Sequence, residues 1–158
     1  MTPEVLVRAI AENGYAGVEL AGPEHWARIA DAGLAIIAER GHDSLANGLN
    51  RPENHDRIDR EIHANLALAE KWRIPVLIYF SGNRSGLTDE AGAAQSAEVL
   101  RRVAPAAEDA GVTLVQGCST ARSTIPPTSA TTPIGASTSA AGLTRRASNS
   151  STTATTYR

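Results

Sequence analysis

Hydrophobic positions follow a helical period and then a strand pattern in the first part of the chain. In residues 2–14, apolar side chains recur on one face from Val5 to Ile10, and Gly14 supplies a stop signal. Residues 15–22 form a short apolar run bounded by glycines, which is typical of a buried strand. The chain therefore begins with a predicted helix and a predicted strand.

The same order of helix and strand repeats as far as residue 115. Further helices are expected at residues 23–33, 53–74 and 87–111, and further strands at 34–41, 75–82 and from 112 to 115. The long helix at 53–74 carries its apolar residues on one face, at Ile58, Ile62, Leu66 and Ala69. Strict alternation of helix and strand predicts parallel strands joined by helical crossovers.

Two α/β architectures satisfy this alternation, an open doubly wound sheet and a (β/α)8 barrel. The expected strands are apolar on both faces, as are parallel strands that helices cover. The nucleotide-binding forms of the open sheet gain no support, because no GxGxxG follows a strand and no GxxxxGKS or GxxxxGKT is present. The pattern of residues leaves both architectures open.

The composition changes at Gln116. From there to Arg158 the chain has no Asp, Glu or Lys, and 19 of the 43 residues are Ser or Thr. Such a segment has too little apolar surface to offset the entropy lost on ordering. We therefore expect a folded part at residues 1–115 and a disordered Ser/Thr-rich tail at residues 116–158.

Charge and cysteine content exclude several classes of protein. The net charge is −2, which gives no electrostatic case for a nucleic-acid partner or an anionic membrane. The single cysteine, Cys118, excludes a disulfide framework and a CxxC metal site. No apolar run has membrane-spanning length, and the N-terminus does not resemble a signal peptide. We expect a cytoplasmic protein.

Candidate chemistry lies where the predicted strands end, because both architectures place their sites there. The polar residues at those positions are Glu19, Arg40, His42, Asp43, Ser81, Asn83 and Arg84. Two other histidines, His55 and His63, are poorly spaced for a shared metal and are expected at the start of the long helix and on its surface.

Four of these strand-end residues are the candidates for substrate binding. Glu19 could hold a metal or substrate, or could cap the helix that follows it. His42 suits proton transfer or metal binding at neutral pH. Asn83 and Arg84 could clamp a carboxylate or phosphate, since Arg presents a forked set of donors, or could simply be solvated loop residues.

Long motifs between Asn13 and Val115 resemble a known family. They read NGYAGVEL, GHDSLANGLNRPENHDRI, LIYFSGNRSGL followed by TDEAG, and RRVAPAAEDAGVTLV. Together they are similar to hydroxypyruvate isomerase-like proteins of the xylose isomerase-like (β/α)8 superfamily. The resemblance implies a partial TIM-type barrel, about half of the full one.

The resemblance also implies a chemistry. Members of the family use a divalent metal, Mg²⁺ or Mn²⁺, to isomerise a small hydroxy-carbonyl or sugar substrate of the aldose–ketose kind. In this chain, His42, Arg84, Asn83 and Glu19 would line one wall of a substrate pocket. No complete metal site is expected, because the family draws its ligands largely from later strands and this chain has no Asp, Glu or His after Asp109. Catalytic residues are left unassigned.

The chain departs from the family at both ends. The family has a strand before its first helix, and after the strand VTLV it continues with segments similar to LLNSKVDHP and PRVKLLYDIYH. Neither segment stands in this sequence. Codons chosen for Gly117 to Pro126, read two bases late, nevertheless encode LLNSKVDHP, and those for Asn149 to Tyr157 encode LLYDSYHL.

We therefore expect a single-base loss near Gln116 that puts the rest of the gene out of frame. On this hypothesis the chain is a truncated, inactive relative of the isomerases that associates with itself through open barrel edges. The alternative is a non-catalytic fragment or binding module with a flexible Ser/Thr tail, whose RRAS segment offers Ser148 to a kinase.

Overall fold

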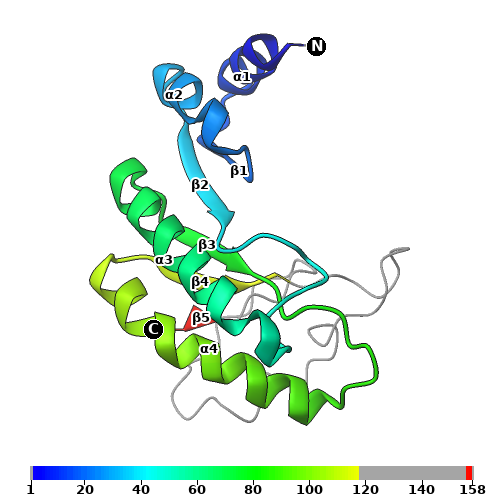
Figure 1. Ribbon diagram of the computed structural model, residues 1–158. Coiled ribbons are helices and arrows are strands. Elements are labelled where there is room, and N and C mark those ends of the chain that lie inside the picture. The colour runs from blue at the N-terminus through cyan, green and yellow to red at the C-terminus, as the bar shows by residue number, and fades with distance from the viewer. Residues whose placement is uncertain (1, 118–155, 158) are drawn as a thin grey trace.

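A computed structural model describes residues 2–117 and 156–157 of the chain. Helices and strands alternate along it, as Figure 1 shows. In chain order the elements are α1 (Pro3–Glu12), β1 (Gly17–Glu19), α2 (Pro23–Asp31), β2 (Ala35–Arg40), the short 3-10 helix η1 (Pro52–Asn54), α3 (His55–Trp72), β3 (Val76–Tyr79), α4 (Asp89–Asp109), β4 (Thr113–Gln116) and β5 (Thr156–Tyr157).

All these strands lie in one sheet, in the order β1-β2-β3-β4-β5. The strands β1 to β4 are parallel, which confirms the α/β prediction of parallel strands and helical crossovers. The strand β5 pairs antiparallel with β4. Gln116 completes β4 and Thr156–Tyr157 form β5, while the boundary predicted between a folded part and a disordered tail stays a prediction. Residues 118–155, with Cys118 and Ser148, lie outside the described residues.

Local sequence signals set the starts of the helices. Thr88 caps α4, because its Oγ1 accepts a hydrogen bond from the N–H of Ala91 at 3.2 Å. Proline stands in the first turn of α1 and of α2, where its missing N–H costs nothing. His55 begins α3 and His63 lies on its exposed side, as the sequence predicted.

The core lies between the sheet and the helices on one of its faces. The face of α3 that the sequence predicted to be apolar is buried at all four positions: Ile58, Ile62, Leu66 and Ala69. It packs with α4 and against side chains such as Leu77, Tyr79 and Leu114 of the sheet. The rings of Trp26 and Trp72 join α2 to α3, with centroids 5.8 Å apart.

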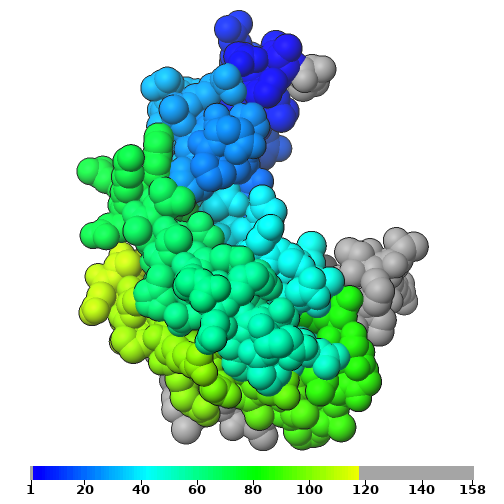
Figure 2. Space-filling model, in the orientation of Figure 1, coloured from blue at the N-terminus to red at the C-terminus, as the bar shows by residue number. Residues whose placement is uncertain are grey.

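The opposite face of the sheet is open where β1 and β2 form it. Val18 pairs with Ile36 and Glu19 with Ala38, so Ile37 is the extra residue of a β-bulge. Ile37 is 45% exposed, while Ile36 and Ala38 are buried. Figure 2 shows a hollow in the outline of the molecule below the N-terminal elements. Among the described residues, no helix has both the length and the apolar character needed to cross a bilayer.

Candidate functional site

Two loops meet at the carboxyl edge of the sheet, and they form the candidate site. The β2–α3 loop comprises residues 41–51 and the β3–α4 loop comprises residues 80–88. Backbone hydrogen bonds join them: Leu49 N–H donates to Phe80 O at 3.2 Å and Asn50 N–H donates to Ser81 O at 2.7 Å. In the other direction, Asn83 N–H of the β3–α4 loop donates to Ala46 O of the β2–α3 loop at 2.9 Å.

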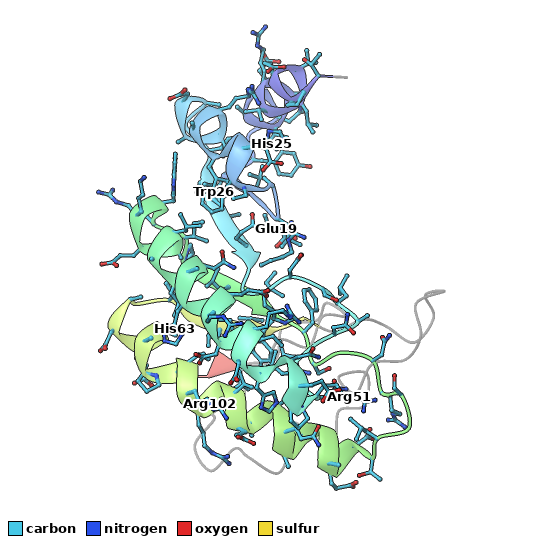
Figure 3. The ribbon with its side chains drawn as sticks, viewed as in Figure 1. Glu19, His25, Trp26, Arg51, His63 and Arg102 are labelled. Carbon is cyan, nitrogen blue, oxygen red and sulfur yellow. The ribbon has the colours of Figure 1, made fainter. Side chains whose placement is uncertain are left out.

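Side chains lock the same two loops together. The amide Nδ2 of Asn50, a fully buried residue, donates to Asn83 O at 2.8 Å. Arg51, labelled in Figure 3, donates from Nη2 to Ser85 O at 3.0 Å. The two motifs that carry the family resemblance in this region therefore fold into one interlocked unit.

His42 lies next to these loops, and both of its ring nitrogens form hydrogen bonds with backbone atoms. It is 1% exposed, and its Nδ1 lies 2.8 Å from Asp43 O, which can only accept. Nδ1 therefore carries the proton, and Nε2 accepts from the N–H of Phe80 at 2.9 Å. This arrangement ties the end of β2 to the end of β3. His42 remains a predicted substrate contact, but its nitrogens hold the scaffold in this structure.

Burial lowers the pKa of His42 below the ordinary histidine value, although its hydrogen bonds to the backbone of Asp43 and Phe80 oppose the shift. The imidazole is therefore neutral at pH 7 in the folded chain. As the pH falls through about 6.5, the unfolded chain gains a proton that the folded chain does not. Stability is consequently lost from about pH 6.5 downward, until the pH reaches the lowered pKa of the folded state.

We expect this loss to vanish in His42→Gln, because glutamine keeps an acceptor and does not titrate. Urea unfolding of both proteins between pH 7.5 and 5.5 measures it. His63→Gln is the matched control, since it removes a half-exposed histidine of α3 that lies outside the two loops. An equal pH dependence in the native chain and in His42→Gln would show that His42 is not the responsible group.

An ion pair on α3 forms hydrogen bonds with the backbone of the β2–α3 loop. Arg57 and Glu61 pair at 2.8 Å, and Glu61 Oε2 accepts the N–H of Asp43 at 2.9 Å. Arg57 Nη2 donates to Asn47 O at 2.7 Å. The sequence analysis did not single out these two residues. Their spacing of four residues on a predicted helix was the available signal.

The other predicted site residues also lie at the carboxyl edge of the sheet. Arg84 forms an ion pair with Asp89, the first residue of α4, so its guanidinium holds the end of its own loop. Asn83 contributes its backbone to the pairing with the β2–α3 loop. Glu19 is exposed at the end of β1, where Figure 3 labels it. β1 and β3 flank β2, and Glu19 pairs with Ala38, which pairs with Val76, so Glu19 is level with the start of β3 rather than with its end.

A buried acid that the sequence analysis missed lies at the end of β2. Glu39 is 5% exposed. Its Oε2 accepts the N–H of Gly22 at 3.1 Å, and its Oε1 accepts the N–H of Arg40 at 2.9 Å. An acid inside an apolar strand was the signal that could have identified it. The carboxylate stands at the N-terminus of α2, where the helix dipole favours negative charge.

The described residues do not fit a divalent metal. Such an ion needs several oxygen or nitrogen ligands that converge on one point. His42 and Glu39 have their donor atoms committed to backbone groups, and Glu19 stands apart on the edge strand. In the part of the chain that the structure describes, no three His, Cys, Asp or Glu side chains are grouped to hold a metal.

Parallel strands, helices on one face and interlocked loops at the carboxyl edge define the class of fold. It is the fold of about half of a (β/α)8 barrel, the partial barrel that the resemblance implied. No family model matches the chain, and no curated protein matches its sequence.

Two solved structures are similar to the chain. AP endonuclease, family 2, from Brucella melitensis aligns with a TM-score of 0.55 and 20% identity, over 70% of this chain and 47% of that chain. D-psicose 3-epimerase, solved in the presence of D-fructose, aligns with a TM-score of 0.50 and 15% identity, over 72% of this chain and 46% of that chain. The chain thus spans about half the length of both neighbours, and these likenesses show the fold alone.

Proposed function

We propose that the chain derives from a hydroxypyruvate isomerase-like sugar isomerase or epimerase and supplies one wall of its substrate site. The supporting observation is the interlocked pair of loops, because both are built from the motifs that carry the resemblance and both lie at the carboxyl edge of the sheet. The likeness to D-psicose 3-epimerase supports a carbohydrate substrate class. Fold alone does not choose among substrates.

The chemistry proposed for the intact protein is proton transfer between adjacent carbons of a small hydroxy-carbonyl compound. In the family a divalent metal polarises the carbonyl and hydroxyl oxygens when it is bound. The described residues of this chain do not fit such a metal, so no step is assigned to it here. What they offer is the exposed carboxylate of Glu19 and polar groups on the loops, a wall that can orient a substrate.

A nucleic-acid substrate receives no support, although one structural neighbour is an AP endonuclease. The net charge of the chain is −2, whereas proteins that bind nucleic acid neutralise phosphates with an excess of Lys and Arg. The proposal therefore retains a small-molecule substrate. It also retains the cytoplasmic location expected from the sequence.

The proposal includes a change of reading frame near Gln116. Its support is that codons can be chosen for residues 117–126 and 149–157 which, read two bases late, encode two family-like segments in family order. On this account the polypeptide itself is non-catalytic. A binding module with a Ser/Thr tail is the alternative, and it depends on Ser148, which lies outside the described residues.

Titration with Mn²⁺ tests the inactive state of the chain as it stands. We expect at most weak binding by calorimetry, and no detectable turnover of hydroxypyruvate, because the described residues do not bring three His, Cys, Asp or Glu side chains together at one point. Mg²⁺ should likewise show at most weak binding by calorimetry. Tight stoichiometric Mn²⁺ binding, or turnover that His42→Ala abolishes, would contradict the proposal.

Self-association through the open side of the half barrel is a further part of the proposal. The strand β1 pairs only with β2 among the described residues, and Ile37 is 45% exposed beside it. Unpaired strand edges and exposed apolar residues favour association. Sedimentation velocity over a concentration series should therefore show dimers or larger species.

Ile37→Ser should weaken this association by about ten- to a hundredfold, since one buried isoleucine is worth roughly 1.5–3 kcal/mol. Leu6→Ser is the control, because Leu6 is similarly exposed, at 50%, but lies on α1. A chain that is monomeric at all concentrations would refute the proposed association, and equal weakening by both substitutions would place the contact elsewhere.

A further inference from the structure

Asn47 and Gly48 are neighbours in the β2–α3 loop and form one of the two Asn–Gly pairs of the chain, the other being Asn13–Gly14. Asn47 is exposed, whereas Gly48 is buried against the β3–α4 loop. A Cβ at position 48 would lie 2.2 Å from Phe80 O, so the interlocked loops require glycine there. The fold therefore keeps Asn47 next to the residue type that shields its own backbone nitrogen least.

An asparagine that precedes glycine can deamidate without an enzyme. The backbone nitrogen of the glycine loses its proton and attacks Cγ of the asparagine, which forms a cyclic succinimide. The bond from Cγ to Nδ2 breaks, and Nδ2 takes up the proton and leaves as ammonia. Water then opens the ring at one of its two carbonyls, so the product is aspartate or isoaspartate. The reaction therefore needs a mobile carboxamide, an available backbone N–H and stabilisation of the amide anion.

The groups that react are unengaged at Asn47 and Gly48. Within residues 2–117 and 156–157, no group forms a hydrogen bond with the Asn47 carboxamide or with the N–H of Gly48. The bonds of Asn47 come from its backbone alone, since its N–H donates to Ser44 Oγ at 3.1 Å and its carbonyl accepts from Arg57. The carboxamide can therefore turn toward the nitrogen of Gly48 without breaking a hydrogen bond.

The second Asn–Gly pair lies at the end of α1, and its reacting groups are engaged. Asn13 Nδ2 donates to Ala9 O at 2.8 Å. Gly14 N–H, the nucleophile of this pair, donates to Ala11 O at 3.0 Å. Both bonds must break before the ring can close, so the fold protects Asn13 in a way that it does not protect Asn47.

Arg57 makes the N–H of Gly48 easier to deprotonate. Its Nη2 donates to Asn47 O at 2.7 Å, and this carbonyl belongs to the same peptide group as the N–H of Gly48. When the nitrogen loses its proton, this oxygen shares the negative charge. A charged donor that already points at the atom where charge develops lowers the barrier. The ion pair with Glu61 holds the guanidinium at this position.

We propose that Asn47 is a site of spontaneous deamidation, and that Arg57 assists the reaction through the Asn47 carbonyl. The isoaspartate product adds a carbon atom to the main chain between Ala46 and Gly48. Ala46 O accepts the N–H of Asn83, so a longer main chain at this point disturbs the contact between the two loops. The modification is therefore an irreversible loosening of the loops that accumulates with the age of the protein.

Peptide mapping of the aged full chain compares the two Asn–Gly pairs directly. Folded protein and a guanidinium-denatured sample would be kept at pH 8 and 37 °C and digested with trypsin, and peptides 9–28 and 41–57 would be followed by mass spectrometry. The denatured chain should lose Asn13 and Asn47 at similar rates, because glycine follows both. The folded chain should lose Asn47 at least about tenfold faster, because the Asn13 pair must first break its hydrogen bonds.

Three results in the folded chain would overturn the proposal. They are equal loss at the two positions, faster loss at Asn13, and no loss at either position in the time that the denatured sample loses both. Tandem mass spectrometry locates the change within peptide 41–57, which also contains Asn50 and Asn54.

Arg57→Gln tests the role of the guanidinium. It should slow the loss of Asn47 about tenfold, because a charge-assisted hydrogen bond to the developing anion is removed. Glu61→Gln is the matched control, since it also removes the ion pair that supports the loop but keeps the guanidinium that donates to Asn47 O. Equal rates in the two variants, or faster loss in Arg57→Gln, would refute assistance by Arg57.

The isoaspartate fraction tests the effect on the loops. It can be separated by ion exchange, because deamidation adds a negative charge, and Asn47→Asp is the control with the same charge and an ordinary main chain. The isoaspartate fraction should unfold at a lower urea concentration than Asn47→Asp, whereas equal midpoints would contradict the loosening. None of these outcomes concerns the isomerase lineage, which the deamidation does not require.

Discussion

Gly48→Ala is expected to lower the free energy of unfolding by more than about 3 kcal/mol, as severe overpacking and lost backbone hydrogen bonds do. A Cβ atom at this position would lie 2.2 Å from Phe80 O, 2.3 Å from Gly82 N and 2.4 Å from Ser81 C. These are backbone atoms of the β3–α4 loop, so no side-chain rotation relieves the clash. The two loops must separate, and the bonds from Leu49 to Phe80 and from Asn50 to Ser81 are then lost.

Urea unfolding followed by circular dichroism measures this loss. Gly14→Ala is the control, because Gly14 has a φ of +78° and nothing within 4 Å of an added Cβ. It tests backbone strain without a clash and should cost about 1 kcal/mol. Equal costs at the two positions would contradict the close packing of the loops.

The sequence predicted the architecture because the elements carry strong local signals. The apolar face of α3, the alternation of helices with buried strands, and the glycines at element ends are all periodic or positional features. The same signals placed Glu19, His42, Asn83 and Arg84 at one edge of the sheet. Parallel strands bring their carboxyl ends to the same edge, so this part of the site followed from topology.

The roles of these residues depend on contacts that periodicity does not encode. His42 binds the backbone of Phe80, 38 positions further along the chain, and Arg84 pairs with Asp89 across a loop. The first contact requires the register of β2 and β3, and the second requires the path of the β3–α4 loop. The sequence alone does not show whether a histidine or arginine at a strand end contacts a substrate or holds neighbouring loops in place.

Glu39 shows most plainly where periodicity fails. A regular strand would place it on the same face as Ile37, two residues earlier. The bulge at Ile37 reverses the alternation, so Glu39 lies on the helix-covered side and Ile37 on the open side. A one-residue irregularity thus decides which carboxylate is buried, and no residue in the segment 35–40 signals a bulge by its type.

The proposed lineage makes its largest prediction for a gene with one base restored near the codon of Gln116. On this proposal the restored frame should encode further strands of the barrel, including an acid after β4 and a segment similar to PRVKLLYDIYH. Those residues would supply the metal ligands that the described residues do not provide. Turnover should be undetectable for the present chain and readily measurable for the protein made from the restored gene.

The most direct measurement is the isomerisation of hydroxypyruvate and a panel of small sugars by the frame-restored protein, with Mg²⁺ or Mn²⁺ present and the present chain assayed alongside. The account predicts turnover of at least one of these substrates by the restored protein and none by the present chain. A restored protein that folds but is inactive across the panel would contradict it, and so would equal activity in both chains.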